Sequence, residues 1–499
     1  MKKRVVIIGA GIGGIATANL LAKKGYDVTV AEQKSTPGGR AGKLEKDGFT
    51  FDTGPSWYLM PDVFERYLQQ FGTSSHKEFD LQKLDPAYQV FFENAEPLTV
   101  TSDLELDAQS FEFIEPGSGA KLKKYVSKSE RIYRASLETF LYSNFSHFSD
   151  FFNPSALRSA PEVMLLAGQT LHRYVARRFR SQRLRQILEY PMVFLGTSPY
   201  QAPALYSLMS ALDFKEGVFY PQGGIYKIIE RLVAIGKDLG VRYRYSTEAV
   251  SILVEDGIAT GVVCKDNGVI PADIVISNAD LHFTETVLVP EPYQTYPEKY
   301  WQNKQASPSA LLMYLGVQGD MSALPHHSLF FVDAWKENFE RMEQNSFSPD
   351  APASMYVCRA SATDPNCAPK GHENIFVLVP LPESAGDSQA LYSTLADQYI
   401  AQIEQMSGVE FKNNIVSKTL YGPGDFKNEL HAWRSSMLGQ SHLLRQSAFF
   451  RTRNRSKKLQ NLFYVGANTV PGIGLPMCLI GAELVVNRIE KLHQNGGPS

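Results

Sequence analysis

One stretch near the N-terminus, residues 5–40, constrains the fold of this chain more than any other. It reads VVIIGAGIGGIATANLL, then YDVTVAE, then PGGR. The apolar residues 5–8 are typical of a buried parallel strand and lead directly into Gly9, Gly11 and Gly14. In a GxGxxG turn the first glycine permits the tight turn, the second lets the backbone approach a pyrophosphate, and the third lets the next helix pack on the sheet. The stretch therefore predicts a βαβ unit with a dinucleotide at the helix N-terminus.

The second half of this stretch indicates which dinucleotide binds. A second apolar strand, residues 28–31, ends at Glu32, about 20 residues beyond the glycines, where a carboxylate binds ribose hydroxyls. Because the strand, the helix and the acidic residue are all present, the alternative of a structural glycine turn that binds no nucleotide is disfavoured. Gly38, Gly39 and Arg40 extend the pattern beyond what a nicotinamide dinucleotide requires. This extension resembles the second half of the fingerprint in the flavin-containing amine oxidase and carotenoid desaturase superfamily, which implies FAD. A surface salt bridge for Arg40 is a weaker interpretation, because two glycines hold its backbone tightly.

Composition excludes several other classes of protein. A length of 499 residues suits two or three domains, and the 43% hydrophobic content is that of a soluble globular chain. The net charge of −2 argues against nucleic-acid binding. Four scattered cysteines without a CxxC predict no disulfide framework and no metal site, and fit a reducing compartment.

The N-terminus also resembles a signal peptide, with Lys2, Lys3 and Arg4 before an apolar stretch. Its many glycines and its nucleotide fingerprint favour strand, turn and helix instead of export. No segment supplies about 20 uninterrupted apolar residues, so no transmembrane helix is expected.

The pattern of elements predicts a discontinuous nucleotide-binding domain. Residues 1–75, 222–285 and 455–499 should form it, because buried strands recur at 274–279 and 462–466 and helices at 224–239 and 477–492. Residues 76–130 and 286–454, with short alternating strands, should form a substrate domain. Residues 131–221 are expected to be mostly helical.

Further motifs carry a resemblance to a known family. They are residues 49–55, 220–224, 276–280 and 461–467, and the loop PGIGLP at 471–476. Over nearly its whole length the chain resembles the bacterial-type phytoene desaturases, an FAD-dependent carotenoid desaturase family of the flavin amine oxidase superfamily. The resemblance implies an α/β fold: a Rossmann-like FAD-binding domain, a substrate domain with a mixed antiparallel sheet, and a helical part that contacts the membrane.

The resemblance also implies the residues that contact FAD. Gly9, Gly11, Gly14 and Glu32 would hold the ADP half, and Arg40 would lie over the pyrophosphate or the ribitol. The backbone of Val250 would meet the adenine, and the amides at Met477 would face the polar edge of the flavin, although core packing explains Met477 equally well. The other expected cofactor residues are Gly39, Gly54, Pro55, Gly466, Ala467 and Gly474.

The C-terminal signature departs from the family pattern at three positions. Asn468 stands where Gly or Ser is usual, Val470 where His, Gln or Thr is usual, and Ile473 where a smaller residue is usual. The glycines and prolines that shape the loop are kept. Flavin binding is therefore expected, while substrate length and reaction type are less constrained.

The implied reaction is dehydrogenation of phytoene or a related linear carotenoid. A CH–CH bond beside a conjugated segment would lose a hydride to the flavin and a proton to a base or to water, while the polyene delocalises the positive charge. No strong nucleophile is required, and we assign no catalytic base. His326 and His327 are adjacent, so we expect their side chains to diverge and to serve a structural role.

Such a substrate dissolves in lipid, so residues 146–210 are the candidate for membrane contact. Arginines would attract anionic headgroups at about 1 kcal/mol each, although a core helix with a solvated arginine face is the alternative. The expected location is cytoplasmic, at the inner face of the cell membrane. The apolar members of the segment are Phe148, Phe151, Phe152, Met164, Leu165, Leu166, Met192, Val193, Phe194 and Leu195, and the basic members are Arg173, Arg177, Arg178, Arg180, Arg183 and Arg185.

Other functions on this scaffold stay open at this point. They are a carotenoid isomerase, an end-group oxidase, an amine oxidase, and a non-catalytic prenyl-lipid-binding protein. The intact fingerprint with Glu32 and Arg40 disfavours the non-catalytic protein. Because no second GxGxxG occurs, we expect an external electron acceptor, oxygen or a quinone.

Overall fold

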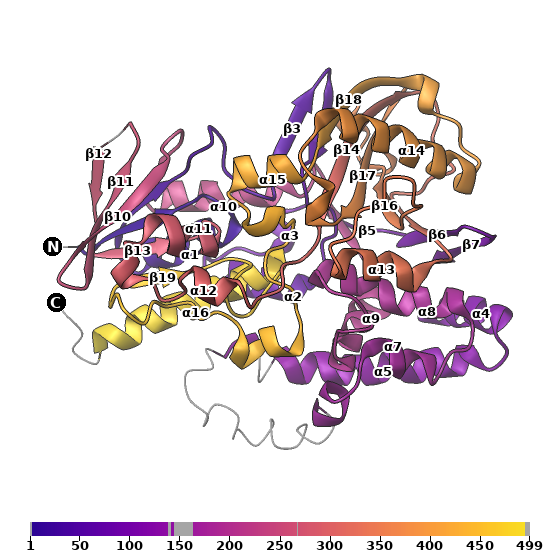
Figure 1. The fold of residues 1–499 in the computed structure, drawn as a ribbon, viewed down its shortest axis with the longest axis horizontal. Coiled ribbons are helices and arrows are strands. Elements are labelled where there is room, and N and C mark those ends of the chain that lie inside the picture. The colour runs from indigo at the N-terminus through magenta and orange to yellow at the C-terminus, as the bar shows by residue number, and fades with distance from the viewer. Residues whose placement is uncertain (1, 138–140, 144–162, 267, 495–499) are drawn as a thin grey trace.

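The computed structural model describes residues 2–137, 141–143, 163–266 and 268–494, and it has two main sheets at opposite ends of an elongated molecule (Figure 1). The N-terminal sheet has five parallel strands in the order β19-β13-β1-β2-β9. Their bounds are β1 Arg4–Ile8, β2 Asp27–Ala31, β9 Arg242–Arg244, β13 Ile274–Ser277 and β19 Leu462–Tyr464. These strands come from three separated stretches of the chain.

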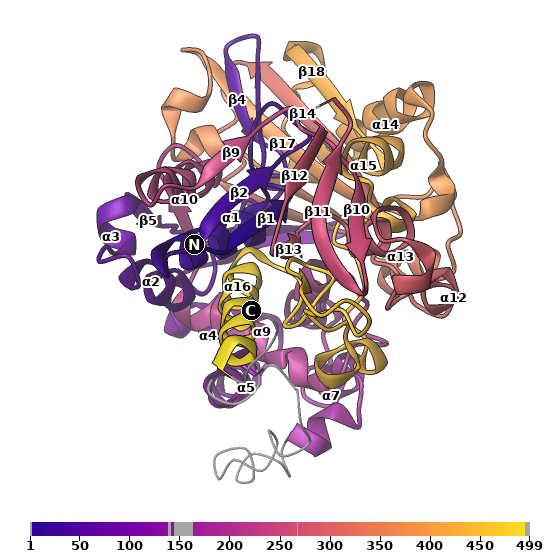
Figure 2. The same cartoon turned by 90° about the vertical axis from the view of Figure 1, so that its left-hand side faces the viewer.

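Alternating side chains of β1 show how this sheet is covered on both faces. Val5 and Ile7 pack in one apolar cluster with helices α1, α10 and α16, whereas Val6 and Ile8 pack in another with a three-stranded antiparallel sheet. Both faces are therefore dry, as parallel sheets require. Figure 2 shows this end of the molecule with both termini toward the viewer. The covering elements are α1 Ile12–Lys23, α10 Tyr226–Asp238, α16 Leu475–Gln494, β10 Ala249–Glu255, β11 Ile258–Cys264 and β12 Gly268–Pro271.

The second sheet has seven strands in the order β18-β14-β17-β16-β15-β6-β7. All its pairs are antiparallel except β15 with β6. One face packs on α14, Gln389–Ser407, and the other faces the large apolar cluster in the middle of the molecule. The strand bounds are β6 Tyr88–Phe92, β7 Ala95–Val100, β14 Ser309–Gln318, β15 His327–Phe331, β16 Met355–Cys358, β17 His372–Leu381 and β18 Ile415–Tyr421.

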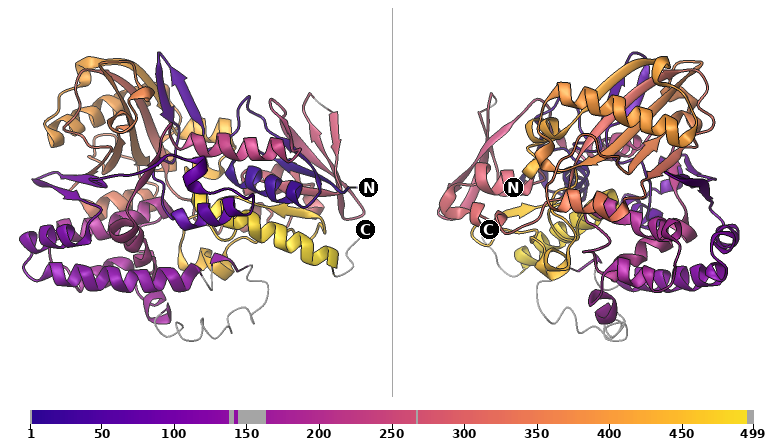
Figure 3. Two further views of the ribbon diagram at one scale, coloured as in Figure 1. Left: turned by 180° about the vertical axis from the view of Figure 1, so that it is seen from behind. Right: turned by 45° about the vertical axis from the view of Figure 1, so that its right-hand side comes forward.

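A helical layer closes the free face of this sheet, as Figure 3 shows from two further sides. The first helix of this layer begins at Leu104, whereas the sequence predicted a helical part over residues 131–221. None of the helices in the described part of the chain is both long enough and apolar enough to cross a membrane. The helices of the layer are α4 Leu104–Ile114, α5 Ser118–Ser136, α7 Leu171–Ala176, α8 Gln182–Glu189 and α9 Met209–Ala211.

Shorter elements connect the two ends. In the described part of the chain the remaining α-helices are α2 Pro61–Gln69, α3 Ser75–Glu78, α11 Leu281–Phe283, α12 Glu298–Trp301, α13 Trp335–Glu343 and α15 Pro423–Leu430. The remaining strands pair as β3 Lys43–Lys46 with β4 Phe49–Asp52, and β5 Leu81–Lys83 with β8 Phe219–Pro221. The fold is thus the expected α/β fold, with a parallel nucleotide-type sheet and a separate, mostly antiparallel sheet.

Candidate active site

One large pocket of about 1110 Å³ runs between the two sheets. At one end it is lined by Gly9, Gly11 and Glu32, where β1 and β2 end. At the other end it is lined by Trp335 and Phe339 under the seven-stranded sheet. Apolar side chains form most of the wall between these ends. The pocket can therefore hold a polar dinucleotide and a long apolar molecule end to end.

The glycines of the first turn form a cradle, a closely packed turn in which a side chain at Gly11 or Gly14 would clash with its neighbours. A Cβ on Gly11 would lie 2.6 Å from Asn278 Nδ2, and one on Gly14 would lie 2.2 Å from the carbonyl oxygen of Gly9. Gly14 does not line the pocket, so its role is the close approach of α1 to β1. Helix α1 has no side-chain cap at Gly11, which leaves the first N–H groups of the helix available to phosphate oxygens.

Glu32 is 6% exposed and lines the same end of the pocket. Its Oε2 accepts a hydrogen bond from the backbone N–H of Ala10 at 2.7 Å, and its Oε1 accepts one from Lys34 at 2.9 Å. Burial raises the pKa of this carboxyl, and the two backbone donors oppose the rise. These bonds fix the carboxylate at the end of β2, where its remaining lone pairs can accept ribose hydroxyls.

Arg40 extends into the middle of the pocket with few partners. Its Nη2 lies 3.5 Å from the carbonyl oxygen of Ser436 and 4.0 Å from Asp280 Oδ2. Its Nε is buried and has no hydrogen-bond partner among the described residues. Gly54 lies behind it, since a Cβ there would sit 2.3 Å from the Arg40 carbonyl oxygen. A guanidinium with an unused donor in a pocket fits an anion such as a pyrophosphate.

The C-terminal loop and the start of α16 complete the pocket. Gly466, Ala467, Gly474 and Met477 all line it, as do Gly39, Gly54 and Pro55. Val250 does not: it is 38% exposed, and its neighbours Thr247 and Ala249 line the pocket instead. The structure thus brings together eleven of the thirteen predicted cofactor residues in one wall and leaves out Gly14 and Val250.

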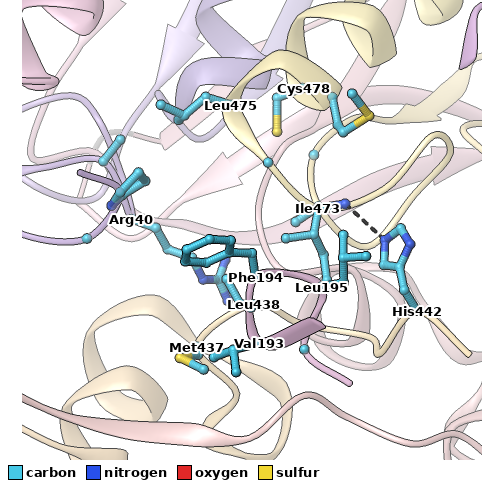
Figure 4. Close-up of a pocket in the computed structure, with 18 of the residues that line it drawn as sticks. Arg40, Val193, Phe194, Leu195, Met437, Leu438, His442, Ile473, Leu475 and Cys478 are labelled. Carbon is cyan, nitrogen blue, oxygen red and sulfur yellow. Dashed lines mark hydrogen bonds between the residues drawn. The ribbon is translucent and has the colours of Figure 1, made fainter. Parts of the chain in front are cut away.

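Three further residues around this wall were not identified from the sequence. His442 Nε2 accepts the Ile473 N–H at 3.2 Å (Figure 4), and its Nδ1 lies 3.0 Å from the Tyr206 hydroxyl. Arg451 is 2% exposed and donates to backbone carbonyls of Ala467 at 2.5 Å and Thr469 at 3.1 Å. Burial lowers the pKa of Arg451 to about 10. No local sequence pattern predicts that His442 or Arg451 lies beside the pocket.

The third of these residues, Asn278, had a signal in the sequence. It follows the buried strand β13, whose polar exit stands out in an apolar run. Its side chain packs against the first glycine turn and lines the pocket. A polar residue at the carboxyl end of a central parallel strand is where ligands bind in such sheets.

One expectation for the helical part is wrong. The structure places Val193, Phe194 and Leu195 in the pocket wall (Figure 4) and Met192 in the core, so these four do not form an outer apolar face. The 3₁₀ segment Tyr190–Leu195 turns them inward. Phe148, Phe151 and Phe152 lie outside the described residues.

The remaining members of the segment divide between surface and interior. Met164 and Leu165 are 74% and 64% exposed, while Leu166 is buried. Arg173, Arg177 and Arg180 are exposed. Arg178, Arg183 and Arg185 are partly buried, and Arg178 packs its guanidinium on Tyr174.

The expectation that His326 and His327 diverge is wrong. Their ring centroids lie 4.5 Å apart. His326 precedes β15, which begins at His327, so the two residues do not follow the alternation of one strand. Both are buried, and His327 stacks on Trp57 with ring centroids 4.5 Å apart.

Comparisons with known proteins agree with this geometry. Residues 12–489 match the flavin-containing amine oxidoreductases. The chain is 40% identical over 480 residues to the carotenoid 3,4-desaturase of Haloarcula japonica, covering 96% of each chain. It is 32% identical to the zeta-carotene-forming phytoene desaturase of Myxococcus xanthus, covering 98% of this chain and 94% of the relative. A putrescine oxidase variant shares the fold at a TM-score of 0.64 and 14% identity, over 99% of this chain and 100% of the other.

The chain therefore belongs to the flavin-containing amine oxidoreductase family and, within it, to the carotenoid desaturases. Its cofactor is FAD. The closely packed glycines, the buried carboxylate of Glu32 and the unused Nε of Arg40 are residue types that fit that dinucleotide.

Proposed function

We propose that this protein is an FAD-dependent desaturase that introduces double bonds into phytoene or a related linear carotenoid. The observation that carries the proposal is the continuous pocket, which joins a dinucleotide cradle to a long apolar cavity in a chain of this family. An amine substrate would be expected to meet polar and charged groups in the cavity. The wall around Val193, Phe194, Leu195 and Leu438 is mostly apolar, with Arg40 and His442 beside it (Figure 4).

FAD, when bound, supplies the hydride acceptor, and the protein contributes binding, orientation and a dry environment. The apolar wall holds the polyene in place and keeps water from the carbon that becomes electron-poor. Arg40 and the α1 N-terminus would hold the pyrophosphate, and Glu32 would hold a ribose. The hydrogen bond from Ile473 to His442 fixes the loop beside the cofactor.

A narrower candidate is desaturation at the 3,4 position. The identity to the Haloarcula japonica carotenoid 3,4-desaturase, 40%, exceeds the 32% to the Myxococcus xanthus phytoene desaturase. Such an enzyme would act on an already conjugated linear carotenoid and leave phytoene unchanged. The two candidates therefore differ in substrate and not in mechanism.

The test uses purified FAD-loaded protein and liposomes that contain either phytoene or a conjugated linear carotenoid. Chromatography and absorption spectra should show added double bonds, and the flavin should bleach when oxygen is absent. Consumption of the conjugated carotenoid alone would assign the 3,4 reaction. Unchanged carbon–hydrogen content with a shifted isomer would indicate an isomerase. An unreduced flavin with every substrate would contradict desaturation.

We further propose that the protein docks on the inner face of the cell membrane from the cytoplasm. Exposed apolar residues border the pocket from two segments: Met164 and Leu165 belong to the same helical turn as pocket residues Val163 and Ala167, and the pocket residues Leu444 and Phe450 are 51% and 60% exposed. A lipid-dissolved substrate could pass between these segments without crossing water. Apolar side chains inserted at the headgroup boundary stabilise such binding.

Flotation with anionic liposomes tests this docking. A variant with Met164→Gln, Leu165→Gln and Phe450→Gln should lose liposome binding and keep its flavin spectrum. Phe113→Gln is the matched control, because Phe113 is 93% exposed on α4 and does not line the pocket. Equal binding of both variants would contradict the proposed surface.

The electron acceptor is proposed to be external, either oxygen or a quinone. The sequence contains one GxGxxG only. Stopped-flow reoxidation of the reduced enzyme distinguishes the two acceptors, since a quinone-dependent enzyme reoxidises slowly in air and rapidly with quinone-loaded liposomes.

A further inference from the structure

Three side chains of types that can bind metal ions lie close together behind the pocket wall, outside the cofactor site. They are His326, His327 and Cys358, all buried, with one ligand atom of each within 4.8 Å of the others. His327 and Cys358 are register partners on the neighbouring strands β15 and β16, so their side chains share the face of the sheet that looks toward the pocket. His326 joins them because the chain bends before β15.

The hydrogen bonds leave one nitrogen of each ring unused. His326 Nδ1 lies 2.7 Å from Thr363 Oγ1, and His327 Nδ1 lies 2.8 Å from the Tyr356 hydroxyl. Both Nε2 atoms are buried and have no partner within the described part of the chain. Buried ring nitrogens without a hydrogen-bond partner are unusual in a native interior. A ring with one nitrogen held by an oxygen and the other free is the arrangement found in metal-binding histidines.

In a neutral imidazole one ring nitrogen has a lone pair that a metal ion can accept. A cysteine binds a metal ion as the thiolate, so a cation has to displace the thiol proton of Cys358.

We propose that His326, His327 and Cys358 bind one copper(I) ion. Binding forms a copper–sulfur bond and two copper–nitrogen bonds and releases the thiol proton, without a change of oxidation state. Thiolate sulfur is a soft ligand that selects copper(I) or zinc, and two imidazoles with one thiolate are a trigonal copper ligand set.

Charge favours the monovalent ion over zinc. Copper(I) and a thiolate sum to zero, whereas a divalent ion would leave a positive charge in a buried site. Ligand bonds of about 2.0–2.3 Å require the side chains to close by about 1 Å, within the range of small torsional changes.

The ion would lie directly behind the pocket. Trp57, which stacks on His327, lines the pocket, and so does Tyr356. The proposal does not depend on the carotenoid substrate, so its test needs no turnover and can fail while the proposed function holds.

The experiment titrates the chelator-treated, FAD-loaded protein with copper(I) under anaerobic conditions against bathocuproine disulfonate. We expect one tightly bound copper per chain, and loss of that binding in Cys358→Ser and in His326→Asn. Thr363→Val should weaken binding by about 10- to 100-fold. The matched controls are Cys264→Ser, a buried thiol in the three-stranded sheet, and His372→Asn at the start of β17; both should bind copper normally.

A second measurement covers the case in which Cys358→Ser does not fold. X-ray absorption at the copper edge of the unsubstituted protein should show one sulfur and two nitrogen neighbours. Absence of stoichiometric copper, unchanged binding in a folded Cys358→Ser, or a copper site without sulfur would each overturn the proposal. Preferential zinc binding would overturn the choice of ion.

Discussion

A buried carboxylic acid behind the pocket wall makes a quantitative prediction. Asp213 is 4% exposed, and its Oδ2 accepts hydrogen bonds from the hydroxyls of Tyr88 at 2.7 Å and Tyr190 at 3.1 Å. Its Oδ1 has no partner among the described residues. Burial raises its pKa from 3.8 to about 7, and the two tyrosine hydrogen bonds oppose the rise. Tyr190 lines the pocket and Asp213 does not.

The sign of the pH dependence follows from this shift. The folded protein holds a proton on Asp213 that the unfolded chain releases near its ordinary pKa. The stabilisation is complete below about pH 4 and is lost as the pH rises through about 7. A change from 3.8 to about 7 corresponds to about 4 kcal/mol of unfolding free energy. The Asp213→Asn variant keeps an acceptor oxygen for both tyrosine hydroxyls and has no carboxyl group to titrate. Its unfolding free energy therefore does not fall in this way as the pH rises.

Urea unfolding of the FAD-loaded protein from pH 4.5 to 8.5, followed by tryptophan fluorescence, measures the effect. The unfolding free energy of Asp213→Asn relative to the unsubstituted protein should rise with pH by up to about 4 kcal/mol. The control is Asp350→Asn, which removes an exposed acid and should leave the unfolding free energy close to that of the unsubstituted protein. A pH-independent difference for Asp213→Asn would refute the reasoning. Flavin reduction by carotenoid should persist in this variant, because the carboxyl group is behind Tyr190.

Three other substitutions test the cofactor wall. Gly14→Ala places a Cβ 2.2 Å from the Gly9 carbonyl oxygen, so the purified protein should contain little flavin by absorbance, whereas Gly168→Ala should keep it. Arg451→Met removes a buried cation that bonds the Ala467 carbonyl; potentiometric titration should show a more negative flavin potential, by on the order of 30 mV. Ile473→Ala should cost about 2 kcal/mol of stability and change the preferred carotenoid in competition assays with two substrates, and an unchanged preference would count against a role in specificity.

Local sequence patterns predicted those parts of the fold and the site that depend on residues close together in the chain. The first βαβ unit follows from glycine spacing and an apolar strand, and Glu32 lies where that unit places it. Long-range pairing has no local signature: no pattern in β6 specifies that it pairs parallel with β15. The error at residues 192–195 has a related cause, since an apolar run can face a membrane or a pocket with the same composition. The error at His326 and His327 arose because β15 begins between them, at His327. Arg451 was missed because its partners are backbone carbonyls, which any residue type can supply and which therefore leave no sequence pattern.

The three residues that depart from the family signature, at positions 468, 470 and 473, lie in different surroundings. These surroundings indicate which of the three can affect substrate specificity. Asn468 bridges two elements: its Oδ1 accepts the Gln440 N–H at 2.8 Å and its Nδ2 donates to Asp280 at 3.0 Å. Val470 is 2% exposed and does not line the pocket. Only Ile473 does, beside Leu195 in Figure 4. If a residue of this loop tunes the substrate, it is therefore Ile473, and the competition assay on Ile473→Ala should show a change that Val470→Ala does not.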